Sequence, residues 1–134
     1  MASTEAPGGD CEAADAVARV RKHAKKTVIS VVRFDTEGFE LLYISGQARA
    51  MYDDKEVMNE HFDEIYDYVN VDFAEMALFS EELFPDSGSV NYVTTAMEGM
   101  KILRVYAGHT GVFLSLHPEE PVVPLVEIVD AHLL

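Results

Sequence analysis

The 134-residue sequence predicts an α/β (α+β) protein with a five-stranded antiparallel sheet flanked by helices. Three observations predict this class. Two β-branched segments lie in the first third of the chain, and three lie in the last third. A long segment of helical periodicity, residues 53–84, separates them, and a helical segment lies at each end. The expected order is α-β-β-α-β-β-β-α, in a chain long enough for one domain with one core.

The N-terminal residues 1–10 are small, polar and contain Gly and Pro, so we expect a disordered lead before a single domain over 11–134. A first helix is expected from about Cys11 to Lys25. Its weak apolar stripe would face the sheet, and the basic residues near its end suit the negative pole of a helix dipole.

Two strands should follow the first helix. Residues 27–34 are apolar on both faces, as in a central strand, and residues 39–45 return after a turn at 35–38. These segments predict a hairpin with a four-residue loop.

The central helical segment carries apolar residues on one face and acidic residues on the other. Met58, Phe62, Ile65 and Val69 are spaced at i, i+4, i+7 and i+11, and the stripe continues through Phe73, Met76, Phe79 and Leu83. Residues 70–72 should divide the segment into two helices, with Asp72 as the N-cap of the second. Residues 85–88 should end it.

The remaining elements are three strands in a meander and a last helix. The strands are expected at 90–97, 100–107 and 112–116, with turns at 98–99 and 108–111. Residues 118–121 contain two prolines and two glutamates, which are favourable at a helix start. An apolar helix would then pack on the sheet.

The chain is strongly acidic, with 24 Asp and Glu against 10 Lys and Arg and a formal net charge of −14. Because 49% of the residues are hydrophobic, we expect a folded core inside a carboxylate-rich shell and not a disordered acidic tail. Such a shell is screened at molar salt, which indicates a salt-adapted, haloarchaeal cytoplasm. The single cysteine fits a reducing interior. We expect no signal peptide and no membrane span.

The only basic region is near the N-terminus, where residues 1–33 hold six basic and four acidic side chains. This cluster could contact nucleic acid or an acidic membrane surface. It could instead pair with the chain's own acidic helix or with that of a symmetry mate. The acidic body argues against nucleic acid as the main partner, so we favour the pairing interpretation.

Residues typical of catalytic and metal sites are scattered. His61 and Glu64, at i and i+3, could hold a divalent ion, but no second pair of ligands is visible. Cys11 has no activating neighbour in sequence. The sequence contains no nucleophile elbow, no P-loop and no dinucleotide fingerprint. We therefore predict no enzymatic activity, no catalytic residues, no cofactor and no metal.

The predicted order of elements resembles the roadblock/LC7 and longin group of profilin-like α/β/α folds. The segment 31–44 (VVRFDTEGFELLYI) resembles the opening of small acidic haloarchaeal proteins of unknown function. The resemblance implies a non-catalytic domain that dimerises through a helix or a sheet edge. It also implies a platform or regulator for small GTPases and other switch proteins.

Together these inferences predict a non-enzymatic regulatory or adaptor module that acts as a cytoplasmic homodimer through protein–protein contacts. The loop at 46–51 is the best placed for a contact. The expected partner surface is Met51, Tyr52 and the helix that follows, including Met58. The basic side chains considered as contacts are Arg21, Lys22, Lys25 and Lys26.

Two other functions stay open. The first is a small-ligand sensor, which a polar residue buried among Val93, Leu103, Val105 and Leu114 would support. The second is a nucleic-acid-associated regulator that uses the basic first helix.

Overall fold

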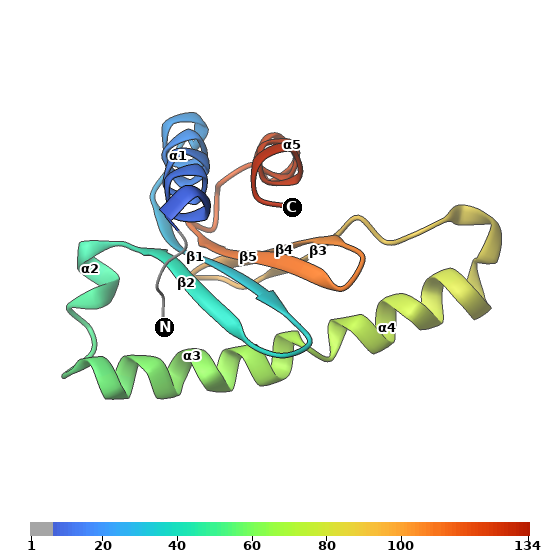
Figure 1. Ribbon diagram of the computed structural model, residues 1–134, viewed down its shortest axis with the longest axis horizontal. Coiled ribbons are helices and arrows are strands. Elements are labelled where there is room, and N and C mark those ends of the chain that lie inside the picture. The colour runs from blue at the N-terminus through green and yellow to red at the C-terminus, as the bar shows by residue number, and fades with distance from the viewer. Residues whose placement is uncertain (1–6) are drawn as a thin grey trace.

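The computed structural model describes residues 7–134 and confirms the predicted fold class. A five-stranded antiparallel sheet has helices on both faces (Figure 1). The helices are α1 (Pro7–His23), α2 (Gly46–Arg49), α3 (Lys55–Val69), α4 (Asp72–Leu78) and α5 (Val123–His132), with a π-helical turn η1 (Phe79–Leu83) and a 3-10 turn η2 (Pro85–Ser87). The strands are β1 (Val28–Asp35), β2 (Phe39–Ile44), β3 (Tyr92–Ala96), β4 (Lys101–Ala107) and β5 (Thr110–Leu116).

The strand order is β2-β1-β5-β4-β3, so the N-terminal hairpin and the C-terminal meander join through β1 and β5. Val32 pairs with Phe113 within this seam. The predicted turn between the first two strands forms as expected, because the Asp35 carboxylate accepts hydrogen bonds from the N–H groups of Glu37 and Gly38. The two edges of the sheet are β2 and β3.

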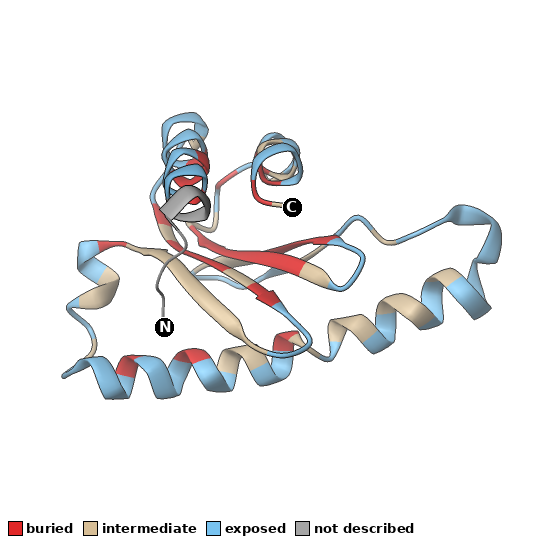
Figure 2. Ribbon diagram, in the orientation of Figure 1, coloured by how far each residue is buried: buried red, intermediate tan, exposed pale blue. Residues whose placement is uncertain are grey.

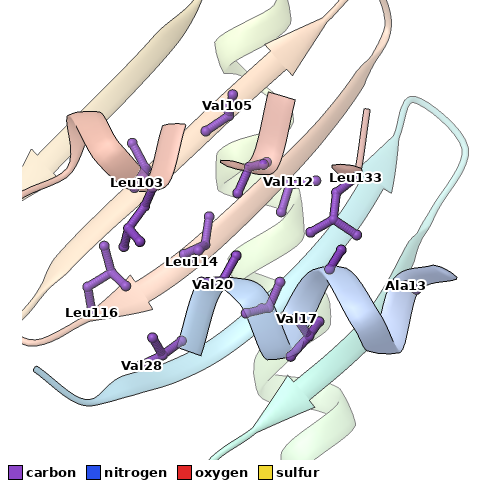
Figure 3. Close-up of a cluster of buried hydrophobic side chains, with 14 residues drawn as sticks. Ala13, Val17, Val20, Val28, Leu103, Val105, Val112, Leu114, Leu116 and Leu133 are labelled. Atoms are coloured by element: carbon purple, nitrogen blue, oxygen red, sulfur yellow. The ribbon is translucent and has the colours of Figure 1, made fainter. Parts of the chain in front are cut away.

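Helices α1 and α5 cover one face of the sheet and form an aliphatic core with it (Figures 1 and 3). Small side chains of α1, such as Ala16 and Val20, let this helix lie close to the strands. Val31, Leu103 and Leu114 supply the sheet side and are fully buried. Because burial of one such side chain contributes about 1.5–3 kcal/mol, this layer supplies much of the stability of the domain.

Helices α3 and α4 cover the opposite face with an aromatic core. Phe34 makes edge-on contacts with Phe73 and Tyr106, with ring centroids 5.8 Å apart in both pairs. Phe62 of α3 stacks on Phe113 of β5. Figure 2 shows that only a narrow stripe of α3 is buried. Helix α4 alternates between intermediate and exposed residues, and the segment after it is largely exposed.

Several boundaries differ from the expected ones. Helix α1 begins at Pro7 and not at Cys11, so the last four residues of the expected lead are helical. The rest of that lead, residues 1–6, lies outside the described part of the chain. The expected loop at 46–51 contains the short helix α2, because Ser45 caps it by accepting a hydrogen bond from the Ala48 N–H.

Among residues 7–134, no helix is both long enough and apolar enough to cross a membrane.

Glu120 has a role that its place before the last helix does not indicate. Its side chain is buried, and its carboxylate accepts hydrogen bonds from the backbone N–H groups of Lys25 (3.0 Å) and Lys26 (2.6 Å). Its backbone oxygen accepts a hydrogen bond from the Lys101 ammonium. The residue therefore joins the linker between α1 and β1 to the segment before α5.

Replacing Glu120 with alanine is expected to lower the free energy of unfolding by about 3 kcal/mol, because two N–H groups lose a charged acceptor. Urea denaturation in molar KCl measures the change. The neighbouring Glu119→Ala variant is the matched control. The Glu119 side chain is 74% exposed, so its loss should cost less than about 0.5 kcal/mol. Equal effects of the two variants would contradict the buried role of Glu120.

Candidate functional site

The structure separates the three residues expected to form the partner surface. Met51 is 84% exposed in the linker after α2, and Tyr52 is half-buried beside α3. Met58 is only 5% exposed and packs in the aromatic core. The expectation that Met58 contacts a partner was therefore wrong, because the apolar face of α3 is turned to the sheet at this position.

The basic residues of the first helix lie on the face of the sheet opposite to the acidic helix α3 (Figure 1). The expected pairing of this cluster with the chain's own acidic helix is therefore wrong. Arg21 instead lies over the ring of Tyr43 on β2, with its guanidinium carbon 4.5 Å from the ring centroid. The Lys26 ammonium lies 3.9 Å from Glu119, while the side chains of Lys22 and Lys25 are exposed.

The main group of exposed apolar side chains lies on a segment that we call the α4–β3 arm (residues 71–92). The arm projects beyond the sheet after α4 and then returns to β3 (Figure 1). The rings of Phe79 and Phe84 stack on one another, 6.1 Å apart and nearly parallel. Six large apolar side chains of the arm are exposed: Val71, Leu78, Phe79, Leu83, Phe84 and Tyr92.

The apolar stripe of the sequence extends through this arm, but only the first part of the arm packs against the core. Phe73 and Met76 pack against the aromatic core, as the periodicity predicts. Phe79 and Leu83 have the same periodicity and are exposed, because the π-helical turn and the arm carry them past the sheet. The spacing identified the apolar face, but it could not show which of these residues pack on the sheet and which stay exposed to solvent.

Strand β3 is an edge strand with one side of its backbone open. The C=O of Asn91 and the N–H of Met97 bond to the β4 side. Because backbone groups alternate in direction along a strand, Tyr92, Thr94 and Ala96 direct their N–H and C=O groups to the free edge. Natural edge strands often carry charged side chains that prevent pairing with another strand, but β3 carries none.

A buried ionic network fixes the start of the arm to the sheet. Asp72, the first residue of α4, accepts hydrogen bonds from Arg104 (2.8 Å) and Tyr106 on β4. Arg104 also donates to the hydroxyl of Thr95 on β3. Asp72 was expected to cap α4, but the N-cap is Val71, and the carboxylate binds these sheet residues instead. The arm therefore leaves the sheet from a fixed point.

The same network affects the ionisation of Tyr106. Burial and the hydrogen bond to Asp72 raise the pKa of the Tyr106 hydroxyl far above its ordinary value of 10. The hydroxyl therefore stays protonated and donates to Asp72 across the physiological range. Arg104, with its side chain 9% exposed, neutralises the carboxylate.

A second feature lies between the sheet and the middle of α3, at His61, Phe62 and Ile65. A cavity of about 610 Å³ opens between α3, the α2 linker and the turn joining β3 to β4. Its lining is mostly apolar, with Ile44, Phe62 and Ile102 among its walls. The hydroxyls of Ser30 and Ser115, 2.9 Å apart, lie on the sheet side of the cavity.

The ligand site that we considered from the sequence, a polar residue buried among Val93, Leu103, Val105 and Leu114, does not form. Leu103, Val105 and Leu114 belong to the aliphatic core under α1 and α5, whereas Val93 packs on the other face. The four residues therefore do not form one site. The serine pair was not identified from the sequence, where its signal is one serine among the apolar residues of each of two strands.

The histidine considered as a metal ligand has another contact. Nδ1 of His61 lies 2.6 Å from the hydroxyl of Tyr52, and burial raises the pKa of that tyrosine. Within residues 7–134, no group of three or more His, Cys, Asp or Glu side chains is arranged to hold a metal ion. The pair of Tyr52 and His61 instead lies at the wall of the cavity.

The layers of this fold define its class. An α1–α5 layer, a central sheet of order β2-β1-β5-β4-β3 and an α3–α4 layer form the architecture of a roadblock/LC7 domain. A crystal structure of the Roadblock/LC7 domain from Streptomyces avermitilis superposes with a TM-score of 0.54 and 14% sequence identity, covering 85% of each chain. At this identity the likeness establishes the fold.

The sequence itself assigns the family. Residues 14–134 match the model described as a domain of unknown function, DUF7522, so the chain belongs to that family. None of the curated proteins matches the chain.

Proposed function

We propose that this protein is a non-enzymatic adaptor or regulatory module that works as a homodimer through protein–protein contacts. The observation that carries this proposal is the exposed α4–β3 arm next to the open edge of β3. An arm with six exposed apolar side chains is unfavourable in water, and association removes that surface from solvent.

A second copy of the chain fits this surface better than an unrelated strand. Two β3 strands can pair antiparallel across a twofold axis, so that each residue meets its counterpart and the two sheets become one. Because β3 has no charged residue, the pairing brings no like charges directly opposite one another. The apolar arms lie beside the strands and would be covered in the same step.

The dimer would leave the outer face of α3 and the exposed Met51 free for another protein. That face carries five acidic residues of α3 and suits a partner with a basic surface. We propose a small GTPase or another switch protein as the partner class, from the roadblock-like fold together with this free face.

Two measurements test the proposal in molar KCl. Light scattering after gel filtration should give twice the 14.9 kDa protomer mass. Affinity capture of the tagged protein from its native host, followed by mass spectrometry, should recover a switch protein at near-stoichiometric ratio. Charge-reversal variants of exposed α3 acids, such as Asp63→Lys with Asp67→Lys, should lose this protein and remain dimeric. A monomer that captures nothing would overturn the proposal.

We also propose that the protein works in a salt-rich, haloarchaeal cytoplasm, because repulsion among its carboxylates must be screened. We expect the melting temperature to fall by about 10 °C or more between 3 M and 0.05 M KCl. A variant with Glu60→Gln, Asp63→Asn, Glu64→Gln and Asp67→Asn removes four exposed charges and should lose less stability at low salt. Thermal melts by circular dichroism measure both. A salt-independent melting temperature would exclude the proposed adaptation.

A further inference from the structure

We propose that the cavity beneath α3 is a binding site for an uncharged, largely apolar small molecule that carries one hydrogen-bond acceptor. This site lies away from the α4–β3 arm, so the inference goes beyond the proposed adaptor function and does not depend on it. It rests on the size of the cavity, the polar groups within it and the charge around it.

The cavity has the size and lining of a ligand site. Its volume of about 610 Å³ lies within the range of 300–1,000 Å³ that is typical of small-molecule pockets. Elements from both ends of the chain contribute to its walls, from β1 to β5.

The serine pair gives the cavity a specific polar contact. Ser30 and Ser115 are 2% and 6% exposed, and the Ser30 hydroxyl donates to that of Ser115. The Ser115 hydroxyl proton is then left without an acceptor among the side chains of the described part of the chain. A buried hydroxyl is stabilised when it donates, so a carbonyl or ether oxygen of a ligand would complete the pair.

The negative charge around the cavity disfavours binding of an anionic ligand. Helix α3, which forms one wall, carries five acidic residues and one lysine, and the whole chain has a net charge of −14. An acidic ligand such as a fatty acid would be repelled by this surface. Among residues 7–134, the ionisable side chains in the cavity wall are those of Tyr52 and His61, which bind one another. An uncharged molecule fits this environment.

The mouth of the cavity contains side chains that can adapt to a ligand. Met51, Met97 and Met100 line it, and Met51 and Met97 are 84% and 48% exposed. Methionine is flexible and polarisable, so these side chains can move over a bound apolar group at small cost. Their exposure in the free protein is then explained by contacts that form when the site is filled.

The test uses Nile red, a neutral fused-ring dye with a carbonyl group, added to the full-length protein in molar KCl. We expect saturable fluorescence enhancement with one dye per protomer. Ala48→Trp places a large side chain in the cavity wall and should weaken binding about tenfold or more. Ala50→Trp, at an exposed position of the same segment, is the matched control and should bind as the wild type does.

A second pair of variants keeps the test valid if Ala48→Trp does not fold. Ile65→Trp fills the cavity from α3, and Tyr68→Trp changes an exposed residue of the same helix, 77% accessible. Circular dichroism melts establish that each variant is folded. Weaker binding by the folded cavity variant but not by its control is the expected result. Equal binding by all variants, or no saturable binding by the wild type, would overturn the proposed site.

The double variant Ser30→Ala with Ser115→Ala tests the polar contact separately. It removes both partners of the hydrogen bond, so the fold should be little affected. Hydrogen bonding to the carbonyl of Nile red shifts its emission to longer wavelength, so emission from the bound dye should move to shorter wavelength in the double variant. An unchanged emission maximum would show that the serine pair does not contact the ligand and would overturn that part of the assignment.

Discussion

Replacement of Asp72 with alanine is expected to destabilise the protein by about 3–5 kcal/mol, because it leaves the Arg104 guanidinium buried without its counter-charge. The side chains of Asp72 and Arg104 are only 14% and 9% exposed, so water cannot easily replace the lost carboxylate. Tyr106 would also lose its acceptor. Thermal and urea unfolding in molar KCl measure the loss, which corresponds to a melting temperature lowered by about 10 °C or more.

Two further variants separate the buried network from a general effect of charge on α4. Glu75→Ala removes an exposed acid from the first turn of the same helix and should cost less than about 1 kcal/mol. Asp72→Leu combined with Arg104→Met replaces the pair by apolar groups and should recover most of the stability. If Asp72→Ala were no worse than Glu75→Ala, the network would not be what holds the arm to the sheet.

Thr94→Pro in β3 is expected to convert the proposed homodimer to a monomer, raising the dissociation constant by about two orders of magnitude or more. The N–H of Thr94 points to the free edge, so proline removes a donor from the pairing surface but no hydrogen bond from the β3–β4 ladder. Proline is tolerated on edge strands, and the protomer should therefore stay folded. Light scattering at several protein concentrations measures the change.

The matched control for this variant is Thr94→Val, which keeps the backbone N–H. The Thr94 hydroxyl oxygen is buried without a hydrogen-bond partner among the described residues, so its replacement by a methyl group should not destabilise the protein. The valine variant should remain dimeric. A dimer that persists in a folded Thr94→Pro variant would place the interface elsewhere, and Phe79→Ser with Phe84→Ser would then test the arm alone.

The elements of the fold followed from the sequence because their signals are local. The β-branched run in β1 and the spacing of Met58, Phe62 and Ile65 in α3 report the period and the buried face of each element directly. The order of elements then restricted the fold to few arrangements. The comparison with a Roadblock/LC7 structure confirms that restriction.

The features of the candidate sites depend on contacts between distant residues, which no local pattern reports. Asp72 has the chemistry of an N-cap and lies at the start of a helix, yet it binds Arg104, 32 positions away. Glu120 has the sequence context of a helix start but contacts the linker after α1. In both cases a long-range partner outweighs the local preference. The cavity depends on the distance between α3 and the sheet, which sequence periodicity does not contain.

The seam between β1 and β5 has a consequence for how the chain acquires its structure. The N-terminal hairpin and the C-terminal meander are local and can form quickly, but the pairing of Val32 with Phe113 must close a loop of most of the chain. During synthesis β1, which is apolar on both faces, therefore lacks its β5 partner until β5 has left the ribosome. The acidic helix α3 is made in that interval, and its carboxylates would keep the unfinished chain soluble until the two hairpins meet.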